Sequence, residues 1–167
     1  MNEGKLRVAL MGVGAIAQVV HLPVLNELND VELTGVCDVD YVRANALAAR
    51  FGIPHIFRDD ADVFRSDLID AIIICTPSYL HEEQAIAALE AGKHVLVEKP
   101  LALSPEAVER VIAVAERTGR TLMVAMNNRY RPDTVALRPF ATNGELGDVF
   151  LTRGAWLNRK MRVVRPT

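Results

Sequence analysis

Apolar residues occur along the chain in two kinds of segment. Short segments that are mainly apolar, such as Leu6–Met11 and Val31–Cys37, have the length of buried strands. Longer segments between such runs, for example Ala15–Leu28 and Tyr41–Phe51, carry apolar residues at helical spacing. The pattern therefore predicts strands that alternate with helices.

Apart from Asp70, the run Ile69–Cys75 is apolar and rich in β-branched residues, which is typical of a central parallel strand covered on both faces. The predicted strands are Leu6–Met11, Val31–Cys37, His55–Phe57, Ile69–Cys75, His94–Val97 and Thr121–Met126. The predicted helices are Ala15–Leu28, Tyr41–Phe51, Asp60–Ser66, Tyr79–Ala91 and a helix that Ser104 caps, Pro105 begins and Gly119 ends. This order predicts an α/β fold, a Rossmann-like doubly wound parallel sheet that forms one domain over residues 1–126.

The pattern changes after Met126. A connecting helix is expected at 130–141, and a strand-like run follows at Val149–Leu157. Because one strand is not stable by itself, this run must pair with strands that the preceding residues do not supply. Residues 127–167 are therefore expected to be the connecting helix and first strand of an incomplete second domain. The alternative is a complete protein whose last strand pairs with the sheet of another chain.

Composition narrows the class of protein. The 167 residues are 50% hydrophobic and 24% charged, with a net charge of −2 and a mean hydropathy of +0.15, so a packed core is expected rather than disorder. No apolar run approaches the roughly 20 residues of a membrane helix. The first residues lack the apolar segment of a secretion signal, which favours a cytoplasmic location. Basic residues after position 120 are scattered, and this does not support a nucleic-acid partner.

The sequence does not indicate a metal site. Cys37 and Cys75 each end an apolar run, and neither belongs to a C-x-x-C pair. The segment that begins at His81 resembles the zinc motif H-E-x-x-H, but Ala85 stands where the second histidine is needed. Both cysteines are expected to be buried, reduced thiols.

The first strand runs into a G-x-G-x-x-A sequence from Gly12 to Ala17 that opens a helix. Gly12 permits a tight turn, Gly14 lets the backbone approach a pyrophosphate, and the small Ala17 lets the helix pack close to the strand. The diphosphate would then lie against free N–H groups at the helix N-terminus. A simple glycine turn, or a loop of the kind that S-adenosylmethionine enzymes use, remains an alternative.

Asp38 ends the second strand, where a carboxylate can accept hydrogen bonds from the hydroxyls of the adenosine ribose. Its charge would repel a 2′-phosphate, which favours NAD over NADP. Arg43 lies near enough in sequence to keep NADP open. Asp40 is either a second ribose contact or the cap of the helix at Tyr41, and the cap is the favoured interpretation.

The loop after the fourth predicted strand should border a cofactor, because ligands of open α/β sheets bind beyond the carboxyl ends of the strands. Thr76 and Pro77 are the expected contacts there. His81 is interpreted as a residue at the start of the next helix that lines the crevice, not as a catalyst.

A Glu-Lys-Pro peptide ends the fifth predicted strand. Lys99 can hydrogen-bond a substrate hydroxyl or carbonyl and help to move the proton that accompanies hydride transfer. Glu98 is better placed to hold ribose hydroxyls, and the bond before Pro100 is hypothesised to be cis. The alternative is an ordinary surface Glu–Lys pair at a turn.

These motifs together resemble the Gfo/Idh/MocA oxidoreductases, which include glucose–fructose oxidoreductase and inositol dehydrogenase. The resemblance also rests on the peptide Asn127–Pro132 and on Gly144–Val149, and it covers about Leu6 to Leu157. The resemblance implies that the pyrophosphate loop consists of Gly12, Gly14, Ile16 and Ala17, and that Asp38 contacts the ribose. It implies that the nicotinamide half is surrounded by Thr76, Pro77, Glu98 and Lys99. It also implies that Asn127 or Arg129 borders the nicotinamide.

The same resemblance implies a function. It implies an NAD(P)-dependent oxidoreductase that transfers a hydride between nicotinamide and a hydroxyl-bearing carbon of a sugar, cyclitol or polyol. The second domain would be an α+β domain with an antiparallel sheet, of which this chain holds only the beginning, and a homo-oligomer would form through that sheet. Turnover by the chain alone is therefore expected to be slow or absent. The competing hypothesis is a regulatory or sensor protein that binds dinucleotide without catalysis, and retention of Lys99 argues against it.

Overall fold

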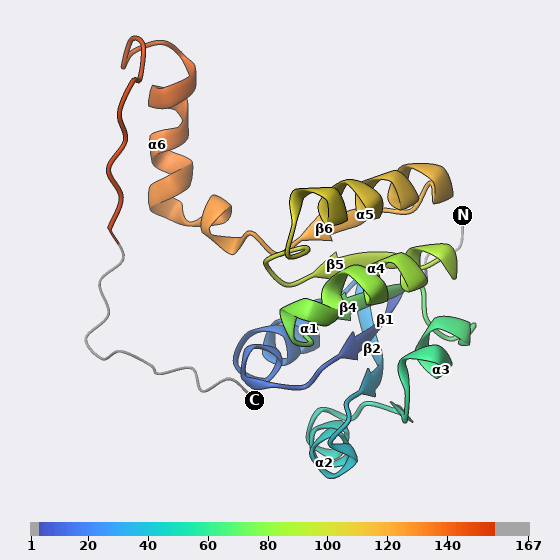
Figure 1. Ribbon diagram of the computed structural model, residues 1–167. Coiled ribbons are helices and arrows are strands. Elements are labelled where there is room, and N and C mark those ends of the chain that lie inside the picture. The colour runs from blue at the N-terminus through green and yellow to red at the C-terminus, as the bar shows by residue number, and fades with distance from the viewer. Residues whose placement is uncertain (1–3, 156–167) are drawn as a thin grey trace. The chain divides into compact units, whose positions relative to one another are not determined.

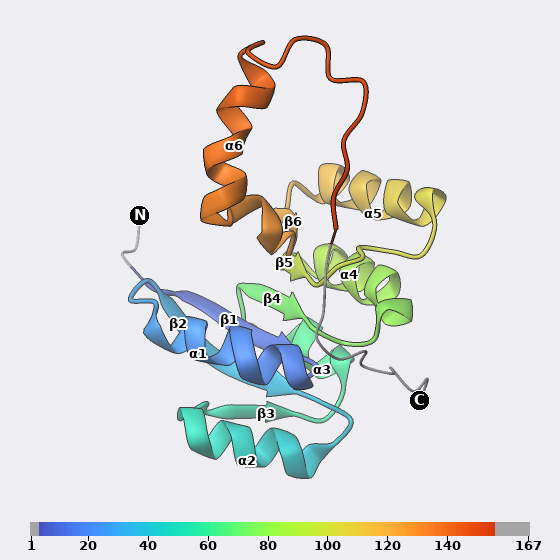
Figure 2. The same cartoon turned by 90° about the vertical axis from the view of Figure 1, so that its left-hand side faces the viewer.

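The computed structural model describes residues 4–155, and the chain divides into two compact units, Met1–Met126 and Asn127–Thr167. The first unit is built on a parallel sheet with the strand order β3-β2-β1-β4-β5-β6 (Figures 1 and 2). Its strands are β1 Leu6–Met11, β2 Val31–Cys37, β3 His55–Phe57, β4 Ala71–Ile74, β5 His94–Val97 and β6 Leu122–Val124. The predicted Rossmann-like fold is thereby confirmed.

The helices of the first unit connect these strands and cover both faces of the sheet (Figure 2). They are the π-helical turn η1 Ala17–His21, α1 Leu22–Glu27, α2 Tyr41–Phe51, α3 Asp60–Arg65, the 3₁₀ turn η2 Ser78–Leu80, α4 His81–Glu90 and α5 Pro105–Thr118. The side chains of Ser104, Asp40 and Asp59 cap α5, α2 and α3 by accepting backbone hydrogen bonds.

Alternation along β4 explains why the unit has two apolar clusters. Ile72 and Ile74 belong to the cluster that includes Leu89 of α4 and Val111 of α5. Ile73 belongs to the cluster on the other face, with residues of α1 and α2. Because successive side chains of a strand point to opposite faces, an uninterrupted apolar strand serves both clusters at once.

Several predicted elements differ from the structure. The predicted first helix contains the π-helical turn η1, in which the N–H of Leu22 bonds the carbonyl of Ala17, directly before Pro23. Proline has no N–H to continue the regular ladder, so the wider turn lies where that ladder would be interrupted. The predicted strands Ile69–Cys75 and Thr121–Met126 are longer than the observed β4 and β6, because ladder pairing begins later and ends sooner than the apolar runs.

The predicted strand Val149–Leu157 is wrong over its described part. Residues 149–155 form no strand, and Trp156 and Leu157 lie outside the described residues. The physical reason is that a strand needs a hydrogen-bonded partner strand, and none of the described elements pairs with this run.

The side chains of Arg7 and Lys93 stabilise the end of the sheet at which the strands begin. The guanidinium of Arg7 donates two hydrogen bonds to the carboxylate of Asp70, the one from Nε measuring 2.8 Å. The buried Nζ of Lys93 donates to the carbonyl oxygens of Ser66 at 2.7 Å and Ile69 at 2.9 Å. These bonds join the start of β1 to the segments that lead into β4 and β5.

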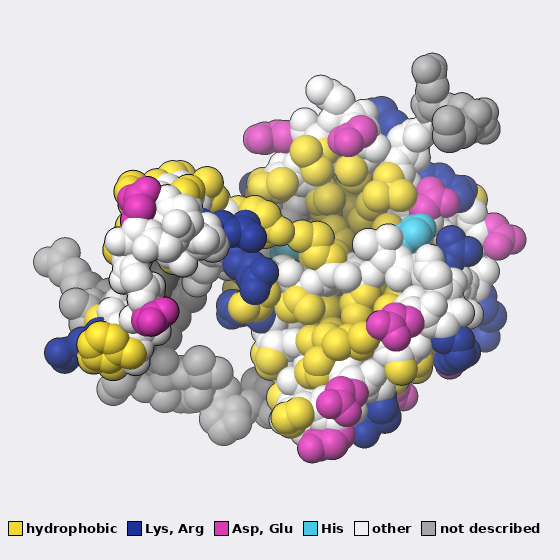
Figure 3. All heavy atoms as spheres, turned by 90° about the horizontal axis from the view of Figure 1, so that it is seen from above, with side chains coloured by type: hydrophobic (Ala, Val, Ile, Leu, Met, Phe, Trp, Pro, Cys, Tyr) yellow, Lys and Arg dark blue, Asp and Glu magenta, His cyan; other side chains and the backbone are white. Residues whose placement is uncertain are grey.

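β6 is an edge strand, and it pairs only with β5 among the described strands. Figure 3 looks toward this edge of the first unit, where hydrophobic side chains gather. Met123 of β6, Met126 just after it and Ile112 of α5 are exposed large hydrophobic residues. An open ladder edge with apolar neighbours is a surface that tends to associate.

The second unit contains the 3₁₀ turn η3 Asn127–Tyr130 and helix α6 Pro132–Thr142. Pro132 stands in the first turn of α6, where its missing N–H costs nothing, and Pro139 lies inside the helix. Among the described residues, no helix is long and apolar enough to cross a membrane.

Candidate functional site

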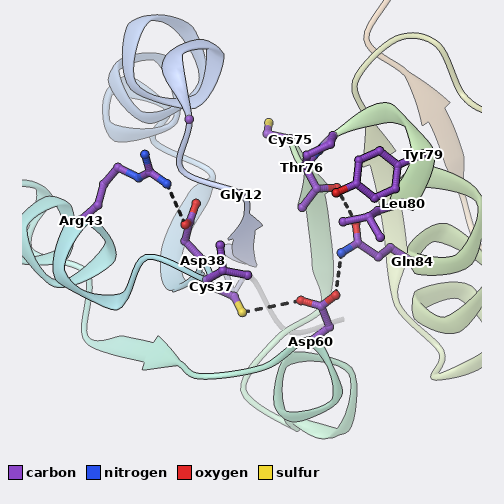
Figure 4. Close-up of a pocket in the computed structure, with 13 residues that line it drawn as sticks. Gly12, Cys37, Asp38, Arg43, Asp60, Cys75, Thr76, Tyr79, Leu80 and Gln84 are labelled. Atoms are coloured by element: carbon purple, nitrogen blue, oxygen red, sulfur yellow. Dashed lines mark hydrogen bonds and ion pairs between the residues drawn. The ribbon is translucent and has the colours of Figure 1, made fainter. Parts of the chain in front are cut away.

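A cavity of about 480 Å³ lies at the carboxyl-terminal ends of β1, β2 and β4 (Figure 4). This is the edge of a parallel sheet where ligands of open α/β folds bind, and the volume is in the range of small-molecule sites. The residues that line the cavity are Gly12, Gly14, Cys37, Asp38, Val39, Arg43, Asp60, Cys75, Thr76, Pro77, Tyr79, Leu80 and Gln84.

The backbone fold requires a glycine at position 12, whether or not a ligand is bound. Its φ is +81°, and a Cβ at this position would lie 2.8 Å from backbone atoms of Cys75 and Thr76. The glycine thus lets the loop after β1 pass close to the loop after β4.

Gly14 is different, because the protein does not require it. Its φ lies outside the left-handed region, and a Cβ built on it meets no atom within 4 Å. Gly14 lines the cavity, so its missing side chain leaves open space on the ligand side of the loop.

Asp38 is held firmly at the end of β2. Its Oδ2 accepts from the N–H of Val13 at 2.7 Å, and its Oδ1 accepts from the N–H of Asp40 at 2.8 Å and from Nη2 of Arg43 at 3.0 Å (Figure 4). Burial opposes ionisation, but these hydrogen bonds to the carboxylate outweigh it and hold the pKa of Asp38 below its usual value. Asp38 is therefore an anion at neutral pH, and its side chain is only 7% exposed.

The two neighbours of Asp38 have separate roles. The Oδ1 of Asp40 accepts from the backbone N–H of Arg43 at 3.0 Å, so Asp40 caps α2, as the favoured interpretation of the sequence predicted. The guanidinium of Arg43, 42% exposed, rests against Asp38 at the rim of the cavity.

A chain of hydrogen bonds crosses the opposite wall of the cavity. The hydroxyl of Thr76 donates to Oε1 of Gln84, and Nε2 of Gln84 donates to Oδ2 of Asp60 at 2.6 Å (Figure 4). The thiol of Cys37 lies 3.8 Å from the other oxygen of Asp60. Because the hydroxyl proton of Thr76 is used by Gln84, the oxygen of Thr76 is left as an acceptor for other donors.

Both thiols near the cavity are held in the protonated form. Burial, followed by the charge of Asp60 and its hydrogen bond, raises the pKa of Cys37 to about 12. Burial, followed by the charge of Glu98, raises the pKa of Cys75 to about 12. These cysteines are inert side chains rather than nucleophiles.

The Glu-Lys-Pro peptide follows β5 at the same edge of the sheet. Oε1 of Glu98 lies 2.9 Å from Nε2 of His21, at the end of η1, and Oε2 of Glu98 accepts from the N–H of Lys99 at 3.2 Å. The side chains of His21 and Glu98 are 12% and 16% exposed, whereas Lys99 is exposed. The peptide bond before Pro100 is cis, which confirms the hypothesis from the sequence.

The structure brings some of the predicted site residues into one cavity and places others elsewhere. Those that line it are Gly12, Gly14, Asp38, Thr76 and Pro77. Ala17 is fully buried under the glycine loop, and Ile16 is 40% exposed. His81 is 1% exposed and its ring does not line the cavity. Asn127 belongs to the second unit.

Sequence reasoning missed Asp60, Gln84 and Tyr79 as lining residues. Asp60 begins α3 shortly after the end of β3, so its position at the carboxyl-terminal end of the sheet could have been inferred from the parallel order of strands. Gln84 is one helical turn from His81, which places it on the same side of α4. No signal in the sequence indicated that Gln84 would bond both Thr76 and Asp60.

The side chains at the site do not suggest a bound metal. Among the described residues, no group of three or more histidine, cysteine, aspartate or glutamate side chains is arranged to hold a metal ion.

Comparison with known proteins identifies relatives of this chain. The chain is 36% identical over 159 residues to the D-glucoside 3-dehydrogenase of Escherichia coli (strain K12), which covers 95% of this chain and 45% of that protein. The inositol 2-dehydrogenase of Rubrobacter xylanophilus is 37% identical over 73% of this chain and 35% of its own length.

Solved structures show the same fold. The scyllo-inositol dehydrogenase of Lactobacillus casei with bound cofactor NAD(H) and scyllo-inositol has a TM-score of 0.81 at 25% identity, over 86% of this chain and 43% of that chain. A 3-ketoreductase from Actinomadura kijaniata in complex with NADP and TDP-benzene has a TM-score of 0.78 at 32% identity, over 84% of this chain and 43% of that chain. This chain spans less than half the length of each relative named here.

The family model described as "Oxidoreductase family, NAD-binding Rossmann fold" matches residues 6–126, which include the glycine loop, Asp38 and the Glu-Lys-Pro peptide. The chain therefore belongs to the Gfo/Idh/MocA oxidoreductase family.

Proposed function

We propose that the cavity binds the adenosine and diphosphate parts of NAD. The observation that carries this proposal is Gly14: neither its backbone conformation nor packing inside the protein calls for glycine, so the open space at its Cβ position is explained by close approach of a ligand. The diphosphate would lie against the first N–H groups of the helix that follows the loop. Ile16 and Ala17 belong to this turn, and Ala17 acts by letting the helix pack close to β1.

The chemistry of the cavity fits an adenosine ribose. Asp38 is anionic, and its Oδ2, which accepts only the hydrogen bond from Val13, has acceptor capacity left. The carboxylate is suited to ribose hydroxyls and repels a 2′-phosphate, so NAD is the proposed cofactor. NADP is the second candidate cofactor and is expected to bind more weakly. Arg43 at the rim binds its 2′-phosphate only when the guanidinium leaves Asp38.

The nicotinamide half is proposed to lie toward Thr76, Pro77, Glu98 and Lys99. Bound dinucleotide supplies the carbon that gives or takes the hydride. Lys99 is the proposed catalytic residue: its exposed ammonium hydrogen-bonds the substrate oxygen and moves the proton that accompanies hydride transfer. Glu98 is already oriented by His21 and by the N–H of Lys99, and we assign it to ribose hydroxyls.

For the whole protein we propose hydride transfer between nicotinamide and a hydroxyl-bearing carbon of a sugar, cyclitol or polyol. The names of the D-glucoside, inositol and scyllo-inositol dehydrogenases among the relatives support this substrate class. Residues 1–126 are the proposed cofactor domain and 127–167 the beginning of the substrate domain. A cytoplasmic homo-oligomer assembled through that second domain remains part of the proposal.

Calorimetric titration with NADH tests the cofactor assignment. Gly14→Ala is expected to weaken binding by about 10-fold, equal to ~1.4 kcal/mol, because the new methyl group occupies the place of the diphosphate. The melting temperature should stay the same or rise, because the methyl group meets no protein atom. Gly4→Ala, which also meets no atom, is the matched control and should bind NADH normally. Equal affinity in the Gly14→Ala and Gly4→Ala variants would contradict the proposed diphosphate site.

Lys99 is tested in the whole protein, by turnover with NAD and a panel of polyols. Any dehydrogenase activity should fall by about 100-fold or more in Lys99→Ala, the range for losing a general acid–base group. The affinity for NADH should change little, which separates catalysis from cofactor binding. Lys5→Ala removes an exposed ammonium before β1 and is expected to leave both properties unchanged. Undiminished turnover in Lys99→Ala would refute its catalytic role.

A further inference from the structure

His81 is a buried residue whose ring has two unusual partners. It begins α4 and is 1% exposed. Its Nδ1 lies 2.7 Å from the carbonyl oxygen of Pro100, and its Nε2 lies 2.8 Å from the carbonyl oxygen of Thr76. Both distances are those of good hydrogen bonds.

The two partners constrain the protonation state of the ring. A carbonyl oxygen can only accept a hydrogen bond, and a neutral imidazole has only one N–H to donate. In a neutral ring one bare nitrogen would therefore face a carbonyl oxygen, lone pair against lone pair, in a place closed to water. Both contacts are hydrogen bonds only when both ring nitrogens carry a proton.

The cation is stabilised by these two carbonyl oxygens rather than by a paired carboxylate. Burial and the positive end of the α4 dipole oppose the charge, and of the two acidic residues in the first turn of the helix, Glu82 is paired with Arg110 of α5 and Glu83 supplies negative charge. Lys93 provides a precedent within the same unit, because its buried ammonium is also satisfied by two backbone carbonyls.

The carbonyls that His81 joins belong to the two loops of the proposed nicotinamide site. Thr76 follows β4, and Pro100 follows β5 and is bonded to Lys99. On the other side of Lys99, His21 holds the carboxylate of Glu98 at 2.9 Å. The exposed Lys99 thus lies between a side chain fixed by one histidine and a carbonyl fixed by another.

We propose that His81 is a doubly protonated imidazolium and a positioning residue that fixes the Lys99–Pro100 backbone against the loop of Thr76. His81 touches neither substrate nor cofactor in this role. The protonation state follows from the geometry alone, whereas the consequence for ligand binding rests on the function proposed above. The expectation that His81 lines the crevice beside the cofactor is replaced by this indirect role.

The ring itself is observed in long-range ¹H–¹⁵N spectra of the ¹⁵N-labelled chain without dinucleotide. His81 should show both ring nitrogens in the protonated range. His94 is the internal control, because its Nδ1 accepts a hydrogen bond of 3.0 Å from the N–H of Thr121 and must be bare. A His81 ring with one bare nitrogen would overturn the proposed imidazolium. This result does not depend on whether the chain binds a dinucleotide.

The positioning role is tested with His81→Gln and its matched control His94→Gln. Glutamine offers one amide nitrogen, so it cannot reproduce both nitrogen contacts of the ring. His81→Gln is expected to weaken NADH binding by about 10-fold, the effect of losing one hydrogen bond to a charged group. His94→Gln loses a contact at the far end of β5 and should bind NADH within about 2-fold of the unmodified chain.

Thermal melting of both variants separates positioning from simple destabilisation. At equal loss of melting temperature, only His81→Gln should lose affinity for NADH. Equal affinities in the two variants would overturn the positioning role. If the unmodified chain itself fails to bind NADH, the function proposed above fails, while the spectra still decide the state of the His81 ring.

Discussion

The carboxylate of Asp38 joins the end of β2 to the glycine loop, because its Oδ2 accepts a hydrogen bond of 2.7 Å from the backbone N–H of Val13. The loop is thus shaped by a contact within the protein. Its backbone need not be ordered when a ligand binds, and this reduces the entropy cost of binding.

Replacement of Asp38 by serine should change the choice of cofactor. Asp38→Ser removes the negative charge and releases Arg43, so NADH binding should weaken by about 10-fold and NADPH should gain relative to NADH. Fluorescence titration with both dinucleotides measures the ratio. Asp40→Asn is the control, because asparagine retains the cap of α2 and leaves Asp38 in place. An unchanged ratio in Asp38→Ser would show that Asp38 does not select the cofactor.

Acid should weaken the fold through Asp70. The hydrogen bond from Arg7 lowers the pKa of Asp70 to about 2, below the ordinary value of 3.8. Since the folded-state pKa is the lower one, this ion pair stabilises the fold above about pH 4, and the stabilisation is lost as the pH falls toward 2. Asp70→Asn should therefore lower the melting temperature at pH 6 and make less difference near pH 2.

The matched control for this pH dependence is Asp30→Asn, which changes an exposed aspartate near the same edge of the sheet. Melting temperatures from pH 6 to pH 2 should nearly coincide for Asp30→Asn and the unmodified chain. A difference between Asp70→Asn and the unmodified chain that stays constant over this range would contradict the assigned pKa.

The two thiols should resist alkylation. With pKa values of about 12, Cys37 and Cys75 hold very little thiolate at pH 8, and Cys37 is also buried. Iodoacetamide should label the folded chain slowly and the urea-unfolded chain fast, as measured by mass spectrometry. Rapid labelling of either cysteine in the folded chain would show that its thiol is not held in the protonated form.

Gly35 should be intolerant of a methyl group. A Cβ at this position in β2 would lie 2.5 Å from the Phe57 ring on β3. Gly35→Ala is therefore expected to lower the free energy of unfolding by about 1–3 kcal/mol through overpacking, measured by urea denaturation. Adding Phe57→Leu should recover part of this loss, because the smaller side chain leaves room. Full additivity of the two changes would indicate that the methyl group and the ring do not meet.

Elements with strong local signals were predicted with their observed bounds. Val31–Cys37 and Tyr41–Phe51 match β2 and α2, because an apolar run and an Asp40 cap with Gly52 at the end mark them within the sequence. The ends of β4 and β6 were not predictable, since a ladder ends where its neighbouring strand ends. The π-helical turn at His21 also escaped prediction, although Pro23 was a visible sign of irregularity.

The residues of the candidate site also divide into those that the sequence predicts and those that it does not. Gly12, Gly14 and Asp38 were found from spacing, because a turn and a strand end place them by local rules. Gln84 and Asp60 were not found, because their contact depends on how α3 and α4 pack beside each other. Likewise, the burial of His81 is a tertiary property that its place at a helix start does not reveal.

The anchoring of Arg7 to Asp70 and of Lys93 to two carbonyls has an evolutionary consequence. These bonds secure the end of the sheet that faces away from the cavity. Loops at the cavity end can therefore change residues, and with them ligand preference, while the rest of the scaffold keeps its shape. The same sheet can in this way serve many substrates, because the loops that determine ligand preference lie at one end of the strands and the bonds that stabilise the sheet lie at the other.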